Sequence, residues 1–240
     1  PADRRARSDE PARSAGKART GERRGDRMRR PAAATVFGCA SVLLSYPDGD
    51  LGDDLEAVAH GLATLPAGST RSRLEAVAGW LGQLSPTAAA TAYVDTFDLR
   101  RGTSLHLTYY RHGDTRERGM ALTALIDTYR SAGFRIVPGE LPDFLPALLE
   151  LAATHPAGGT VLAEHRMALD ALRLALDKAD SPYADVVAAV GDALPRPSQA
   201  DRDALRRYRA QGPPSERVGL EPFAPPEVVA QGLAMGPTRR

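Results

Sequence analysis

The sequence of 240 residues has very little cysteine, few aromatic residues and no long apolar run. Its one cysteine, Cys39, excludes a disulfide framework and cannot form a metal cluster alone, so we expect a protein of the reducing cytoplasm. Aromatic side chains make up only 5% of the residues. No stretch approaches the ~20 apolar residues that a membrane-spanning helix needs, and we expect no stable membrane association.

The sequence also lacks alternating β patterns and the motifs of common enzymes. Alanine and leucine dominate and long β-branched runs are missing, which favours helix. There is no glycine-rich dinucleotide loop, no phosphate-binding P-loop and no nucleophile elbow. We therefore expect an all-α protein that is not an enzyme and that carries no cofactor and no metal.

Charge is unevenly distributed, although the formal net charge is only +1. Residues 1–30 hold eleven basic and five acidic residues, and the remainder holds 20 basic and 25 acidic residues. We expect the first segment to be a disordered basic tail, because it has almost no apolar content. The mildly acidic remainder argues against nucleic acid as a partner. A rival hypothesis, DNA binding by the tail, predicts binding that depends steeply on salt.

Apolar residues recur at helical spacing through most of the chain, which predicts a single helical-bundle domain over 31–195. We expect about eight helices. They cover approximately 33–45, 51–65, 74–84, 86–97, 120–129, 142–152, 160–178 and 182–194.

Capping signals set several of the expected helix boundaries. Ser85, followed by a proline, is a typical N-cap. Asp114 and Glu117 form a variant of the capping box for the helix that follows them. Gly133 is predicted to end that helix in the left-handed conformation, and Asp143 is predicted to cap the next one.

The packing signal weakens beyond Pro195. Residues 199–210 could form an exposed, charged helix, and the Pro/Gly-rich sequence from Gly212 onward is expected to be flexible. The expected organisation therefore has three parts: a tail over 1–30, the helical domain, and a segment over 196–240 with a charged helix and a flexible end.

The most informative stretch runs from Tyr93 to Tyr110 and reads YVDTFDLRRGTSLHLTYY. Tyr93 and Phe97 are four residues apart and share a helical face, and a cluster of charges follows them. We interpret the stretch as the end of a packed helix that turns into an ordered, charged loop, with a short extended piece over 105–110. Ordered loops of this kind often carry function.

Two catalytic alternatives involve the same stretch. His106, His112 and Asp114 could share a metal in a small metal- or ligand-dependent enzyme, but zinc usually needs more ligands at tighter spacing. Ser104, His106 and Asp114 could form a hydrolytic triad, but no oxyanion-hole signature accompanies them. The charges could instead form an internal salt-bridge network or the rim of a recognition surface, and these two interpretations are compatible.

The run YVDTFDLRRGTSLHLTYYRHGDTRERGMAL, with LLSYPD at 43–48 and ELPDFLPALLEL at 140–151, resembles the nitrate reductase delta-subunit (NarJ) family. That family comprises molybdenum-cofactor assembly chaperones within the wider TorD-like group of helical maturation proteins. The resemblance covers roughly residues 33–195. It implies a cytoplasmic, non-catalytic chaperone that binds the N-terminal region of the apo-form catalytic alpha subunit. Such a chaperone keeps that subunit competent for cofactor insertion before membrane docking.

The resemblance departs from the wider group's motifs at particular positions. A Glu-Pro-x-Asp-His signature associated with client binding is matched by Asp143, but Phe144 stands at the His position. Glu140 and Pro142 match only with shifted spacing, so a nucleotide-binding role is not expected. The oligomeric state is open between a monomer and a swapped dimer, because the connector over 134–141 is long.

The residues and the resemblance together predict a client-peptide site with apolar anchors that give affinity and charges that fix the register. Its expected residues are Tyr93, Phe97, Asp98, Arg100, Arg101, His106, Leu107, Tyr110, Asp114, Pro142, Asp143 and Leu145.

Overall fold

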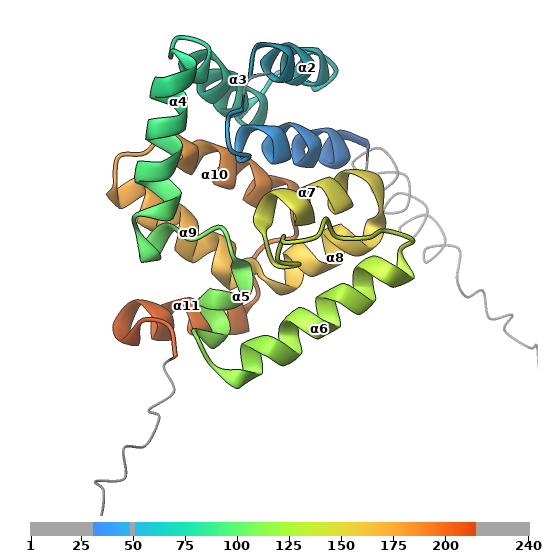
Figure 1. The fold of residues 1–240 in the computed structure, drawn as a ribbon, viewed down its shortest axis with the longest axis vertical. Coiled ribbons are helices and arrows are strands. Elements are labelled where there is room, and N and C mark those ends of the chain that lie inside the picture. The colour runs from blue at the N-terminus through green and yellow to red at the C-terminus, as the bar shows by residue number, and fades with distance from the viewer. Residues whose placement is uncertain (1–30, 49–50, 215–240) are drawn as a thin grey trace, which may run out of the picture.

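The computed structural model describes residues 31–48 and 51–214, and this part of the chain is built from helices joined by turns and loops (Figure 1). The only strand-like pairing within these ranges is one antiparallel bridge between His106 and Phe144. The prediction of an all-α fold is confirmed. The tails expected over 1–30 and beyond Pro214 lie outside the described residues.

In order, the described elements are a helix over 31–43, α2 (Leu51–Ala63), α3 (Ser69–Leu81), α4 (Pro86–Tyr93), the π-helix η1 (Val94–Asp98), the 3-10 helix η2 (Arg101–Thr103), α5 (Leu107–His112), α6 (Arg116–Ser131), α7 (Leu145–Thr154), α8 (Pro156–Glu164), α9 (Arg166–Lys178), α10 (Tyr183–Ala193) and α11 (Gln199–Gln211). The longest connection between the described elements lies between α6 and α7.

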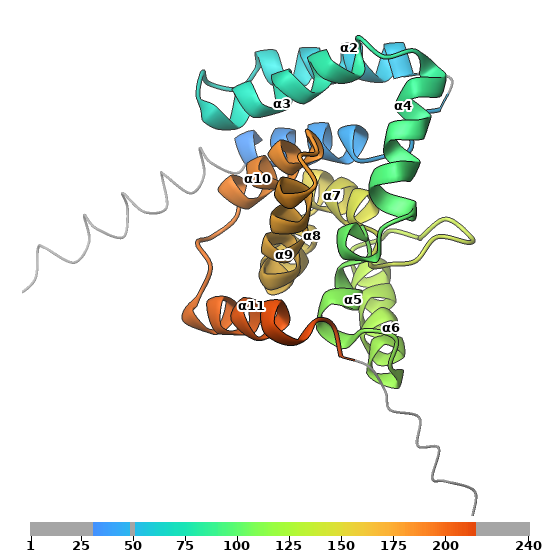
Figure 2. The same ribbon diagram turned by 90° about the vertical axis from the view of Figure 1, so that its left-hand side faces the viewer.

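The helices pack around a leucine- and valine-rich core. α7 packs against α8, α10 packs against both α3 and α9, and α11 packs against α9. Figure 2 shows α2 and α3 at one end of the body and α11 with α5 and α6 at the other. The fully buried residues Leu172 and Leu176 on α9 and Val186 and Val190 on α10 repeat at helical spacing. Each such side chain stabilises the fold by roughly 1.5–3 kcal/mol.

The helix that leads into the candidate site begins and ends much as the sequence predicts. Ser85 is the N-cap of α4, and its side chain accepts a hydrogen bond from the backbone N–H of Ala88. The helix continues past Phe97, but its last turn is the π-helix η1, in which the Leu99 N–H donates to the carbonyl of Val94 over 3.1 Å.

The predicted helix over 160–178 is wrong, because the chain breaks there into α8 and α9. At His165 the backbone leaves the helical region, with φ −95° and ψ 20°. The His165 Nδ1 also lies 2.9 Å from the carbonyl of Val161, which accepts the backbone N–H of His165 as well. Burial of this ring lowers the pKa of His165, which favours the neutral form in the turn.

The predicted extended piece over 105–110 is correct only for its first two residues. The Leu145 N–H donates to the Leu105 carbonyl and the Leu107 N–H donates to the Asp143 carbonyl, which bridges His106 to Phe144. From Leu107 onward the chain is the helix α5, because the Asp143 carboxylate accepts the Thr108 N–H at the start of that helix. The Asp143 carboxylate, 35 residues further along the chain, therefore takes the place of a local N-cap side chain for α5.

Two predicted caps are also wrong. The N-cap of α6 is Thr115 rather than part of a capping box, and the Asp114 carboxylate instead lies 3.5 Å from Arg118. The N-cap of α7 is Phe144, without a side-chain cap, because the Asp143 side chain points toward α5 and α6. Gly133 does end its helix with φ 85°, as predicted.

The predicted charged helix after Pro195 is confirmed as α11. Ser198 and Asp201 form a reciprocal capping box at its start. One side of the helix is not simply exposed, because Leu205 and Tyr208 pack against the core. The Tyr208 ring lies 5.5 Å from that of Tyr110. The domain boundaries stay a prediction.

Within 31–48 and 51–214 no helix is long and apolar enough to cross a membrane.

Candidate functional site

The predicted apolar anchors Tyr93 and Phe97 lie inside the body as part of an aromatic cluster. Their ring centroids are 4.9 Å apart, and Phe97 lies 4.8 Å from Tyr183 on α10. Trp80 on α3 and Tyr46 extend the cluster with edge-to-face contacts of 5.3 and 5.4 Å. Such aromatic pairs each contribute about 0.5–1.5 kcal/mol beyond burial. The cluster therefore fixes the end of α4 against α3 and α10.

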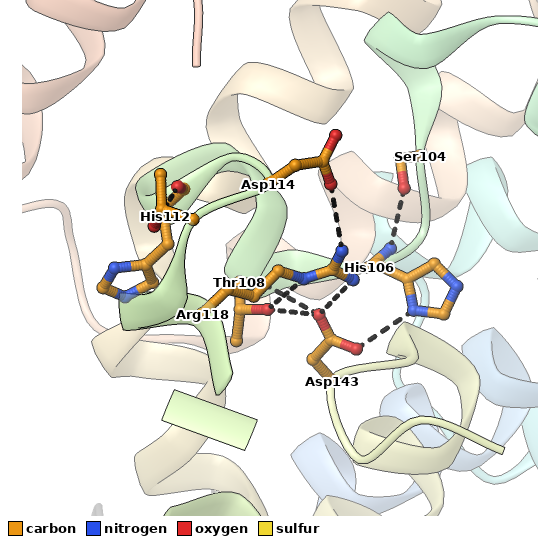
Figure 3. A network of polar contacts seen from close by, with 8 residues as sticks. Ser104, His106, Thr108, His112, Asp114, Arg118 and Asp143 are labelled. Carbon is orange, nitrogen blue, oxygen red and sulfur yellow. Dashed lines mark hydrogen bonds and ion pairs between the residues drawn. The ribbon is translucent and has the colours of Figure 1, made fainter. Parts of the chain in front are cut away.

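A second group of predicted residues meets at Asp143, whose side chain is fully buried. Figure 3 shows its carboxylate facing α5 and α6. His106 Nδ1–H donates to one carboxylate oxygen over 3.0 Å, and Arg118 donates to the other over 3.3 Å. The Thr108 hydroxyl and N–H donate to that second oxygen as well. The network joins the 105–108 segment, α6 and the start of α7.

The protonation of Asp143 follows from these partners. Burial alone would raise the pKa of this carboxyl group, since it disfavours the charged form. The hydrogen bonds from His106 and Thr108, together with the charges of His106 and Arg118, outweigh burial and hold the pKa of Asp143 below its ordinary value. Asp143 is therefore an anionic structural centre at neutral pH, already occupied by protein donors.

The geometry does not assemble the two catalytic alternatives. His106 faces Asp143, whereas His112 Nδ1 lies 3.5 Å from the exposed carboxylate of Glu117, without a hydrogen bond. Among the described residues, no three His, Cys, Asp or Glu side chains are grouped as a metal site requires. The Ser104 hydroxyl accepts the backbone N–H of His106 rather than meeting its ring, so no nucleophile–base pair forms.

The remaining predicted residues divide by exposure. Leu107, Tyr110 and Leu145 are buried, and the Tyr110 hydroxyl donates to the carbonyls of Gly102 and Ser104, which ties the charged loop to α5. The side chain of Arg101 lies outside the described residues. Those that lie exposed are Asp98, Arg100 and Asp114. The predicted set is thus two buried clusters with exposed charges, and its assignment to a client peptide stays a prediction.

A surface that the sequence interpretation missed lies between α6 and the connector over 134–142. It is a cleft of about 590 Å³, and its wall includes the predicted residue Pro142. Large apolar side chains line it or lie beside it with unusual exposure: Val137 is 66% exposed, and Ile126, Phe134 and Leu141 are also exposed. The sequence signal was the stretch FRIVP at 134–138, which is apolar except for Arg135, in a connector that would ordinarily be polar.

At the edge of this cleft one hydroxyl has no partner. Tyr129 on α6 lines the cleft and is 6% exposed, and within the described ranges its hydroxyl makes no hydrogen bond. Burial, then the nearby carboxylates of Glu140 and Glu150, raise the pKa of Tyr129. The group is therefore a neutral donor, and a buried hydroxyl of this kind normally has an acceptor.

Comparison with known proteins gives one family and several relatives. Residues 64–189 match the family model described as Nitrate reductase delta subunit. The Nitrate reductase-like protein NarX of Mycobacterium tuberculosis (strain H37Rv) is 47% identical over 160 residues, which are 65% of this chain and 24% of NarX. This chain therefore spans about a quarter of the length of that relative.

Two relatives carry the name of an assembly chaperone. The Probable nitrate reductase molybdenum cofactor assembly chaperone NarJ of Bacillus subtilis (strain 168) is 34% identical over 154 residues, which are 63% of this chain and 84% of NarJ. The Nitrate reductase molybdenum cofactor assembly chaperone NarJ of Escherichia coli (strain K12) is 33% identical over 149 residues, which are 60% of this chain and 63% of that protein. The family-model match over 64–189 extends beyond the central block on both sides.

Proposed function

Because the chain belongs to the nitrate reductase delta subunit family, we propose that it is an assembly chaperone for nitrate reductase, acting before the molybdenum cofactor is inserted. The observation that carries the proposal is the similarity to NarJ of Bacillus subtilis, 84% of whose length is matched. On this proposal the chain is not an enzyme and holds no cofactor of its own. Its partner is the apo-form catalytic alpha subunit in the cytoplasm.

We further propose that the chain binds the N-terminal region of that subunit as a peptide. The cleft between α6 and the connector over 134–142 is the surface that suits a peptide best. It offers apolar anchors in Ile126, Phe134 and Val137, with Arg130 and Glu140 as charges of both signs on its wall. Affinity would come from the anchors and register from the charges.

The buried members of the predicted site would act by supporting this surface. Asp143 directly follows Pro142 and holds the end of the connector through His106 and Arg118. The wall of the cleft is thereby fixed to α5 and α6. A rigid wall lowers the ordering cost of binding a peptide, which is how a support residue contributes to affinity without touching the client.

The test is titration calorimetry of the full chain with a synthetic peptide of the alpha subunit's N-terminal region. Val137→Asp puts a charge among the anchors and is expected to weaken binding at least about tenfold, or about 1.4 kcal/mol. Leu99→Asp is the matched control, because Leu99 is a large apolar residue with 71% exposure outside this cleft. It is expected to bind like the wild type.

The opposite pattern would relocate the site. Binding lost in Leu99→Asp and retained in Val137→Asp would assign the peptide to the exposed end of η1, beside Asp98. A cellular measurement tests the function itself: the chain should restore nitrate reductase activity in a strain that lacks its own assembly chaperone. Absence of both peptide binding and restored activity would contradict the proposal.

A further inference from the structure

An apolar surface on α6 and the following connector has no cover within the described part of the chain. Ile126 in the second half of α6 is 40% exposed and lines the cleft, whereas Met120 lies six residues earlier and about 120° away around the helix. Phe134, Val137 and Leu141 continue the surface into the connector. Figure 1 shows α6 at the margin of the body, with the connector leading back from its end to α7. Exposed apolar side chains in such a row mark a binding surface.

Tyr129 gives the cleft an aromatic wall. Its side chain is more than nine-tenths buried, and within the described ranges its hydroxyl is closed off from solvent and makes no hydrogen bond. An occupant of the cleft therefore meets the ring of Tyr129 and not its hydroxyl.

The C-terminal segment of the chain leaves the described body next to this surface. A Cβ atom built on Gly113 would lie 1.7 Å from the carbonyl oxygen of Pro214, the last described residue. Gly113 has φ 57° and stands directly before the turn into α6, which begins at Arg116. Only glycine allows so close a backbone approach at this conformation. Pro214 therefore lies at the base of α6.

The sequence of that segment fits the cleft in composition, length and charge. Residues 221–227 read EPFAPPE, and Phe223 is the single aromatic residue of 215–240. Proline-rich segments adopt an extended helix with free carbonyls and dock in grooves lined by aromatic residues, here Tyr129 and Phe134. Phe223 is nine residues beyond Pro214 and can lie up to about 30 Å from it. Tyr129 is only about 20 Å along α6 from its start.

We propose that residues 221–227 bind in the cleft between α6 and the 134–142 connector. Phe223 packs between Ile126, Phe134 and Val137. Glu221 and Glu227 flank the prolines and face Arg130 and Arg135. Resting on the proposed function, the segment is then an internal competitor that a client peptide must displace.

Disulfide trapping in the full chain tests the docking without any client. The native thiol of Cys39 does not interfere, since Cys39 is buried and burial raises the pKa of that thiol. The test pair is Ala224→Cys with Val137→Cys. The control pair is Ala224→Cys with Glu117→Cys, because Glu117 is exposed and lies at the base of α6, closer to Pro214 along the surface. A segment that does not dock would reach the control position at least as readily.

Under mild oxidation we expect the Val137 pair to form its intramolecular disulfide about tenfold faster than the Glu117 pair. Adding Phe223→Asp should reduce the Val137 rate to that of the control pair. Equal rates for the two pairs, or a Val137 rate unchanged by Phe223→Asp, would overturn the proposal. A disulfide between two molecules that depends on protein concentration would assign the cleft to a second copy instead.

The competition is measured separately from the docking and from the proposed function. Adding the alpha-subunit peptide should slow trapping of the Val137 pair in proportion to its occupancy. If the peptide binds by calorimetry but leaves the trapping rate unchanged, it does not compete with residues 221–227 for the cleft. That result would overturn the proposed competition without contradicting the docking of the segment. Peptide that fails to bind in both wild type and Phe223→Asp would count against the proposed client.

Discussion

Asp143 is a buried carboxylate that joins two other parts of the chain. It accepts hydrogen bonds from His106 and Thr108 in the segment over 105–108 and from Arg118 on α6. Removing a buried charge that has several donors leaves each donor without its partner. The effect of a substitution here should therefore exceed that of any surface ion pair.

We expect Asp143→Asn to lower the free energy of unfolding by about 1–3 kcal/mol at neutral pH, because an amide cannot accept from all these donors. The difference should depend on pH. The folded pKa of Asp143 lies below its ordinary value, so its stabilisation is present above about pH 4 and is lost as the pH falls through the folded pKa. Denaturant titrations from neutral to acidic pH measure both effects.

Asp127→Asn is the matched control, because Asp127 forms an exposed i,i+3 pair with Arg130. Its effect should stay within about 0.5 kcal/mol at every pH. A difference between wild type and Asp143→Asn that grows on acidification would contradict the assigned ionisation of Asp143.

The surroundings of individual residues also explain why the candidate site could be predicted only in part from the sequence. Tyr93 and Phe97 were identified as neighbours on one face, which is confirmed by the contact between their rings. The sequence could not show that this face points inward, because its partners Tyr46 and Tyr183 are far away along the chain. The buried position of Asp143 could not be predicted either, because the residues around it are typical of a helix start with Asp143 as the cap.

At the scale of elements, α7 and α8 make the tightest helix contact. Gly158 in the first turn of α8 faces the backbone of Ala152, and a Cβ at Gly158 would lie 2.2 Å from the Ala152 nitrogen. Real Cβ atoms do not approach so closely, and backbone cannot swing aside as a flexible side chain can. The angle between α7 and α8 therefore requires a residue without a side chain at position 158.

Gly158→Ala should therefore destabilise the protein by about 1–3 kcal/mol or more, measured by urea unfolding. Gly159→Ala is the matched control in the same helix, since nothing lies within 4 Å of its added Cβ. There the change should be neutral or stabilising by up to about 1 kcal/mol, because alanine favours helix over glycine. Equal effects of the two substitutions would disprove the close contact.

Element boundaries were predictable where the signal is local. The cap at Ser85 and the left-handed Gly133 each depend on neighbouring residues alone, and both are confirmed. The break at His165 was missed because the apolar spacing of Leu162 and Leu169 continues across it as in one helix. The start of α5 was missed because its acceptor, Asp143, is far away in sequence.

At the scale of the whole molecule, α11 closes one end of the body. Leu205 and Tyr208 pack against the core, and the Tyr208 ring contacts that of Tyr110. Arg166 at the start of α9 donates to the carbonyls of Gly191 and Pro195, which fixes the path from α10 toward α11. Helix α11 therefore packs against the body although the apolar spacing in the sequence weakens beyond Pro195.

Ending the chain after Pro197 should lower the melting temperature by about 5–10 °C, because it exposes the surface that Leu205 and Tyr208 cover. Ending it after Pro214 keeps α11 and should lower the melting temperature by less than the deletion after Pro197 does. Differential scanning calorimetry of the two truncated chains beside the full chain makes the comparison. A larger shift for the shorter deletion would show that α11 contributes little to the body.

The π-helix η1 has a consequence for how relatives are compared along their sequences. Its i→i+5 hydrogen bond from Leu99 to Val94 accommodates one residue more than an α-helical turn. In evolutionary terms it is equivalent to a single-residue insertion within a helix. A relative that lacks it needs a one-position gap between 94 and 98, and every residue after the gap would otherwise be matched to a neighbour about 100° around the helix.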